Sequence, residues 1–211
     1  NVNYPTAGAL GEKLSRVDSF SHPAGVTFAQ YTYMGSGAIV KVAHSQVTGG
    51  LNYDLENGST SGNPTGWDDF GRIDQNRWKK NNSTTFDQYN YAYDRVSNSK
   101  YRDNRVTTVK DEYFFRDGLN RVTSMKRGNL NAGNTDITGT PVFKEDFTLE
   151  SAGNWKAFVQ TTSGAVTLNQ TRTHNAANEM SANTSTVGTE WIDPVHDKTG
   201  NMTQFPQAGA E

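Results

Sequence analysis

The chain contains no cysteine. Disulfide bonds, cysteine-ligated zinc, iron–sulfur clusters and thiol nucleophiles are therefore excluded. Long hydrophobic runs are also missing, because no stretch approaches the roughly 18 apolar residues of a membrane-spanning helix. The hydrophobic fraction is 33% over 211 residues, well below the roughly 45–50% usual in globular domains. We therefore do not expect an enzyme built around a thick central core.

Helical periodicity is scarce as well. No window of about a dozen residues sustains apolar spacing at i, i+3, i+4 and i+7, so long helices are not expected. The chain is not a disordered one either, because 11% of its residues are aromatic and the net charge is only -2. Rings alternate with polar residues in Phe28–Tyr33 and Tyr89–Tyr93, which is typical of strands. The predicted fold class is all-β.

One short pattern recurs along the chain. It consists of an acidic or amide residue, two variable positions, a Gly, Asn or Ser, a polar residue and then, usually, an apolar one. Asp or Asn at the first position can accept backbone N–H groups two or three residues later, and Gly or Asn at the fourth tolerates positive φ. These are the requirements of a type I turn with a bulge, which closes a β-hairpin. The eight copies begin at Met34, Asp54, Asp68, Asp94, Asp117, Glu150, Asn175 and Asp197.

The pattern assigns conformational roles to individual side chains. Aromatic residues such as Tyr93 directly precede several copies, and Arg72 and Arg121 occupy the fifth position of two. We expect these rings to stack across neighbouring strands, and the arginines to pair with acids there. The residues expected to shape the turns are Asp68, Gly71, Asp94, Asp117, Asn120, Gly153, Asp197 and Gly200.

The repeats resemble the YD repeats of the bacterial RHS-repeat family. The resemblance rests on Tyr91-Ala-Tyr93-Asp94, on the recurring Asp-x-x-Gly-Arg, and on residues 111–128 and 170–180. It implies a strip of antiparallel sheet that curves into a hollow shell, often around a toxin or other cargo. Met34 departs from the pattern by replacing the acid, and Arg116 by replacing the aromatic residue before a turn. The widest interval between copies predicts a long loop near Asn129–Pro141.

The repeats also set the expected domain organisation. Residues 30–203 form the YD-repeat array, residues 1–29 form initial strands or a partial repeat, and residues 204–211 form a tail. The first residues, Asn-Val-Asn, include no initiator methionine. We therefore expect a mature product or a piece of a longer protein, with any targeting signal elsewhere.

Three carboxylates are weak candidates for catalysis. Glu145 and Asp146 are adjacent, and either could meet Glu112 from another repeat, because glycoside hydrolysis uses a pair of acids. Adjacent residues on a strand point to opposite faces, so Glu145 and Asp146 are not expected to act as a pair with each other. Nothing in the sequence selects the partners.

A basic cluster is the candidate ligand site. Residues 72–127 carry 13 Lys and Arg against 7 Asp and Glu, and the cluster is densest at Arg77, Trp78, Lys79 and Lys80. Basic residues beside aromatic rings can bind phosphates, acidic glycans or an acidic cargo. The alternative is pairing with acids on neighbouring strands, and no nucleic acid is expected as a partner.

No cofactor or metal site is predicted. His174 and His196 directly precede turns, where other copies carry a ring, so we interpret them as substitutions for aromatic residues. Many RHS proteins carry a self-cleaving Asp-Pro-x-Gly segment at the end of the shell. The sequence Asp193-Pro194-Val-His196 lacks the glycine, and we expect a proline at a strand edge instead.

The sequence therefore predicts a non-enzymatic structural segment of a secreted or cell-surface RHS/YD-repeat protein, building a β-shell for encapsulation or surface interaction. Its partners would be neighbouring repeats of the same or another chain, an enclosed cargo domain, or an extracellular polysaccharide. Three alternatives stay open: a polysaccharide-binding module, a polysaccharide hydrolase, and an extracellular polymer subunit that assembles through unpaired strand edges.

Overall fold

A computed structural model describes residues 1–4, 16–34, 37–55, 66–81 and 83–206. Within them, 14 strands form one antiparallel sheet in which each strand is bonded to its neighbours in chain order. The edge strands are β1 and β14, so the sheet is not closed. The prediction of an all-β sheet of sequential hairpins is confirmed, while its curvature stays a prediction.

The strands are short, and most are joined by tight turns. The only helix in the described part of the chain is the 3-10 turn η1 (Thr108–Lys110), and none is long and apolar enough to cross a membrane. The main sheet contains β1 (Val2–Asn3), β2 (Ser19–Ser21), β3 (Thr27–Tyr33), β4 (Ile39–His44), β5 (Leu51–Asp54), β6 (Gln75–Lys80), β7 (Thr84–Tyr93), β8 (Ser99–Asn104), β9 (Glu112–Arg116), β10 (Val122–Arg127), β11 (Phe143–Leu149), β12 (Trp155–Thr162), β13 (Ala165–His174) and β14 (Met180–Val187). A separate two-stranded sheet contains β15 (Val195–His196) and β16 (Met202–Gln204).

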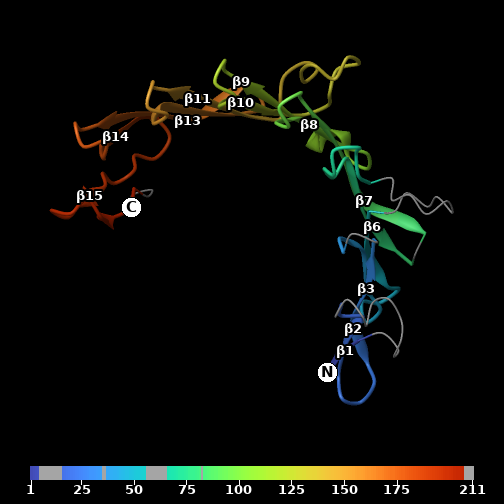
Figure 1. Cartoon of the computed structure of the whole chain (residues 1–211). Helices are drawn as coiled ribbons and strands as arrows, with labels where there is room; N and C mark the ends of the chain where they lie inside the picture. Colours follow the sequence, from blue (N-terminus) through green and yellow to red (C-terminus); the bar gives the residue numbers. More distant parts are fainter. Residues whose placement is uncertain (5–15, 35–36, 56–65, 82, 207–211) are drawn as a thin grey trace. The chain divides into compact units, whose positions relative to one another are not determined.

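The chain divides into two units. Unit 1 comprises residues 1–92 and 103–107, and unit 2 comprises residues 93–102 and 108–211. Within each unit the strands follow one another along the chain, as the colours of Figure 1 show. The predicted domain boundaries after residues 29 and 203 stay predictions, and residues 207–211 of the predicted tail lie outside the described residues.

Few side chains of the sheet are fully buried, because a single layer has no second layer to cover it. Rings instead pack against one another along each face, as between Tyr53 and Trp78 in unit 1 (centroids 5.2 Å apart) and between Phe147 and Trp155 in unit 2 (4.6 Å). The low hydrophobic fraction of the sequence thus reflects a wall of stacked side chains. Among the residues that the structure describes, the buried hydrophobic ones are Ala29, Val40, Leu55, Ile137 and Phe158.

Residues 128–142, the region of the predicted long loop, connect β10 to β11 in unit 2. The loop is held down at several points. Leu130 and Ile137 form an isolated bridge, the Leu130 N–H donates to the buried Asp111 carboxylate at 3.1 Å, and Lys126 Nζ donates to Asp136 Oδ1 at 2.8 Å. The buried Ile137 side chain anchors the loop against the sheet.

Candidate functional site

The recurrent turn has a constant backbone geometry. In the turn that begins at Asp117, the Asn120 N–H donates to the Asp117 carbonyl and the Asp117 N–H donates to the Arg121 carbonyl, both at 3.0 Å. Asn120 has a φ of 63°, in the left-handed region. The same two hydrogen bonds and a positive φ at the fourth position recur in the turns that begin at His22, Met34, Asp68, Asp94, Glu150, Asn175 and Asp197.

The side chain of the first turn residue accepts hydrogen bonds from later residues of the same turn. Asp117 Oδ1 accepts the N–H groups of Leu119 (2.9 Å) and Arg121 (3.0 Å), and Asp117 Oδ2 accepts Arg121 Nε (2.7 Å). One carboxylate therefore binds three donors within five residues. The first residues Asp68, Asp94, Asn175 and Asp197 accept two backbone N–H groups in the same way.

These hydrogen bonds favour the charged form of the aspartates. Desolvation acts to raise the pKa of Asp117, but the hydrogen bonds from Arg121 and Leu119 outweigh it and the pKa is lowered. The pKa of Asp94 is lowered chiefly by the side-chain hydrogen bond from Asn98. The pKa of Asp197 is lowered furthest, by hydrogen bonds from the side chains and backbone of Thr199 and Asn201.

Neighbouring turns of unit 2 are bound to one another. Arg121 Nη1 donates to the backbone oxygen of Glu150 at 2.9 Å, and Asn154 Nδ2 donates to Asn178 Oδ1. His174 Nδ1 lies 3.6 Å from Glu150 Oε1, so this histidine contacts the preceding turn. The turns that begin at residues 117, 150 and 175 therefore form a connected row along one edge of the strands.

Two copies of the repeat differ from the sequence-based assignment. The turn at His22 was missed, because its first residue is a histidine; the signal that could have found it is Gly25 at the fourth position, with Phe20 and Phe28 flanking it. His22 Nδ1 accepts the Ala24 N–H at 3.2 Å. The predicted turn after Asp54 extends into residues 56–65, which lie outside the described residues.

The basic cluster does not form one patch. Alternation along β6 separates Arg77 and Lys79 from Trp78 and Lys80. Arg77 Nη2 and Lys79 Nζ lie 3.4 and 2.8 Å from the buried Asp54 carboxylate. Trp78 packs on Tyr53 and on His44, with the His44 centroid at 6.4 Å. Lys80 lines a separate apolar pocket of about 380 Å³ with Val47, Thr48, Leu51 and Phe86.

The three candidate catalytic carboxylates each have their own partner. Glu112 is buried, and its Oε1 accepts Arg102 Nη2 and Arg127 Nη2, both at 2.7 Å. Glu145 Oε1 accepts Gln160 Nε2 at 3.2 Å, and Asp146 Oδ2 lies 2.7 Å from Lys144 Nζ. Each carboxylate is thus bound to a different set of donors, and a catalytic role for any of the three stays a prediction.

The Asp-Pro segment singled out in the sequence contacts the last strand of the main sheet. Asp193 Oδ1 accepts the Asn183 N–H of edge strand β14 at 2.7 Å, so the Asp-Pro segment lies against that edge. In the described part of the chain, no three His, Asp or Glu side chains converge in a way that could hold a metal ion.

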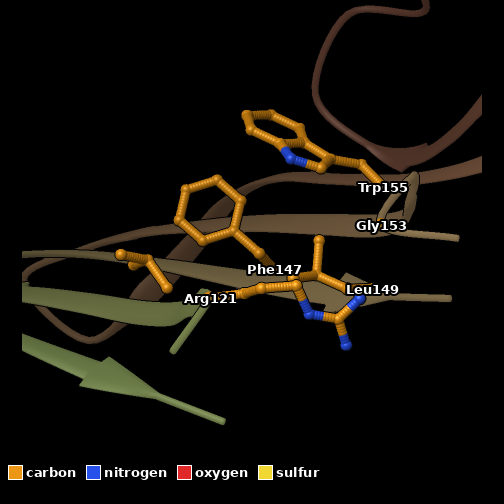
Figure 2. Close-up of a pocket in the computed structure, with 6 residues that line it drawn as sticks. Arg121, Phe147, Leu149, Gly153 and Trp155 are labelled. Atoms are coloured by element: carbon orange, nitrogen blue, oxygen red, sulfur yellow. The ribbon is translucent and has the colours of Figure 1, made fainter. Parts of the chain in front are cut away.

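A pocket beside Trp155 in unit 2 was not predicted. Its volume is about 330 Å³. Figure 2 shows the Trp155 and Phe147 rings projecting from adjacent strands above Leu149 and Arg121. The aromatic residues are evident in the sequence, but the pocket is not. Trp155 lies opposite Leu149 only because the pairing of β11 with β12 shifts its register at the end of β11. The lining residues are Arg121, Val122, Phe147, Leu149, Gly153 and Trp155.

No protein-family model and no curated protein matches the chain. Solved structures do match its fold. The TcdB2–TccC3–TEV crystal structure is 12% identical, with a TM-score of 0.59 over 86% of this chain. The Photorhabdus luminescens Tc holotoxin pore is 12% identical (TM-score 0.53) and the TcdB2–TccC3–Cdc42 structure 13% identical (TM-score 0.55), each over 96% of this chain. The chain spans only 9–11% of the length of those chains, and at this identity the likeness concerns the fold.

Proposed function

We propose that these residues form a segment of an RHS-type β-shell that encloses a polypeptide cargo. The observation that carries the proposal is the uninterrupted chain order of the 14-stranded sheet, in which each hairpin adds to the one before it. Such a sheet grows by repetition, and its area is set by the number of repeats. A wall around a cargo requires this property, whereas a compact catalytic domain does not.

Two further observations support the proposal. The fold resembles segments of the Tc toxin structures, whose chains are about ten times longer, so one hairpin array can be part of a much larger wall. Neighbouring turns are bound to one another, as between Arg121 and the Glu150 backbone. These contacts make the row of turns at the ends of the strands resistant to local opening. We further propose a secreted or cell-surface location.

The experiment is limited proteolysis of the natural gene product that carries these residues. In the native protein, we expect the cargo segment to resist proteinase K while denatured protein is digested throughout. A double variant, Asp94→Ala with Asp117→Ala, should weaken the wall and shorten the lifetime of the protected segment. The matched control is Lys156→Ala, at an exposed position of β12. Digestion of every segment at the same rate in the native protein would contradict encapsulation.

A further inference from the structure

Within the part of the chain that the structure describes, the Arg172 side chain on β13 has no anionic partner. Its guanidinium carbon lies 4.9 Å from the Trp155 ring centroid and 5.9 Å from that of Phe158, and its Nη2 donates to Gln170 Oε1 at 3.2 Å. Among the described residues, no Asp or Glu forms an ion pair with Arg172, and its buried Nε has no acceptor. Arg121, on the same unit, is by contrast paired with Asp117.

The charge on Arg172 is only partly compensated. Burial lowers its pKa, because a guanidinium is less stable away from water, yet Arg stays charged in proteins. Contact with two rings offsets part of this cost. Among the described residues, Gln170 Nε2 and both polar atoms of the Asn183 amide, Nδ2 and Oδ1, are buried without a hydrogen-bond partner, and Asn183 lies directly across from Arg172. The Arg172 guanidinium suits a carboxylate, whose two oxygens match its donors.

The pocket beside Trp155 adjoins the Arg172 side chain, because Trp155 contacts both Arg172 and Phe147. Four of its lining side chains are apolar. Its side-chain donors are the Arg121 guanidinium, which binds Asp117 and the Glu150 backbone, and the Trp155 indole N–H. A sugar ring with several hydroxyl groups would therefore find few hydrogen-bond partners there, whereas an apolar side chain needs none. The volume of about 330 Å³ lies at the small end of ligand pockets.

We propose that Arg172 and this pocket bind a polypeptide segment in which a carboxylate neighbours an aromatic or branched aliphatic side chain. The carboxylate accepts hydrogen bonds from Arg172, and the apolar side chain occupies the space between Trp155, Phe147 and Leu149. The proposal rests on the proposed function, since the segment belongs to the cargo, and it identifies a contact that the wall makes with that cargo.

The test compares two peptides of equal shape, acetyl-Phe-Glu-amide and acetyl-Phe-Gln-amide, titrated into the 211-residue chain. The readout is the indole N–H resonance of Trp155, assigned with Trp155→Phe. We expect the Glu peptide to bind at least about tenfold more tightly, because only a carboxylate forms charge-assisted hydrogen bonds. Arg172→Gln should reduce its affinity to that of the Gln peptide, and Arg172→Lys should give an intermediate value. The control Arg95→Gln, at an exposed position, should change neither.

Several results would overturn the site. They are equal affinity for the two peptides, no binding of either at millimolar concentration, and tighter binding of trigalacturonate than of the Glu peptide. If Arg172→Gln does not fold, the wild-type peptide pair still decides. Failure of the site is distinguishable from failure of the proposed function: a protected cargo without peptide binding contradicts the site alone, and peptide binding without protection contradicts encapsulation alone.

Discussion

Arg121 joins its own turn to the following one through the backbone oxygen of Glu150, to which Nη1 donates at 2.9 Å. The same side chain closes its own turn, since Nε donates to Asp117 Oδ2. A guanidinium can serve both acceptors because its donors diverge from a rigid plane. The fifth position of the repeat therefore stabilises both the hairpin and its contact with the next hairpin.

The two roles of Arg121 can be separated by substitution. Arg121→Lys keeps the charge near Asp117 but cannot bind Asp117 and Glu150 in the same geometry. We expect a thermal midpoint lower by about 2–4 °C, the shift typical of one modest interaction in a chain of this size. Differential scanning calorimetry measures it. Arg95→Lys, at an exposed position, is the matched control, and equal midpoints for the two variants would contradict the link between turns.

The left-handed conformation of Asn120 predicts a difference between two small residues. Asn120→Ala should destabilise the chain by about 1 kcal/mol, because a Cβ is disfavoured at positive φ without the local hydrogen bonds of an amide. Asn120→Gly should stay within about 0.5 kcal/mol of the wild type, since glycine adopts this conformation freely. Urea unfolding measures both. The same order is expected at Asn178, and a glycine variant as unstable as the alanine variant would contradict the turn geometry.

The buried Glu112 should be sensitive to loss of charge. Glu112→Gln leaves Arg102 and Arg127 without their shared anion, and we expect a loss of about 3 kcal/mol in the free energy of unfolding. Glu145→Gln is the control, because Glu145 is only half-buried and pairs with a neutral amide. Chemical denaturation compares the two. Equal free energies of unfolding for the two variants would show that the ion pairs of Glu112 with Arg102 and Arg127 contribute nothing to stability.

The turn aspartates predict a dependence of stability on acid. Their pKa values are lowered in the folded chain from the ordinary value of 3.8, so their contribution is present above about pH 4. It is lost as the pH falls through the lower folded values, because the unfolded state then binds protons more readily than the folded state. We expect the urea concentration at the midpoint of unfolding to decrease as the pH is lowered from about 5 to about 3. Asp117→Asn should reduce that fall, and a fall equal to that of the wild type would exclude Asp117 as a contributor.

The hairpin turns could be predicted from the sequence because their chemistry is local. Asp117, Asn120 and Arg121 lie within five residues, so hydrogen bonds and φ follow from residue types alone. The turn at His22 shows the boundary of this inference, since its backbone hydrogen bonds form without an acid at the first position. The order of strands also followed, because consecutive hairpins in a repeat array pair with their neighbours.

The partners that the charged residues bind depend on which strands lie side by side. Alternation along β6 already separates Arg77 from Trp78, but the partner of Arg77 is Asp54, which lies 23 residues earlier in the chain. Glu112 likewise receives Arg127 from the next strand. A sequence pattern names candidate charges, whereas the register between strands selects their partners.

By itself the sequence determined an all-β chain of hairpins with a thin core, because turn hydrogen bonds and residue alternation act over a few positions. Only the tertiary structure decided which side chains meet across strands. The clearest case is Arg172 over Trp155, 17 residues away, where the guanidinium meets two rings and no acid among the described residues. Such contacts depend on bulges that shift the register by single residues, and one shift moves a side chain to a different neighbour.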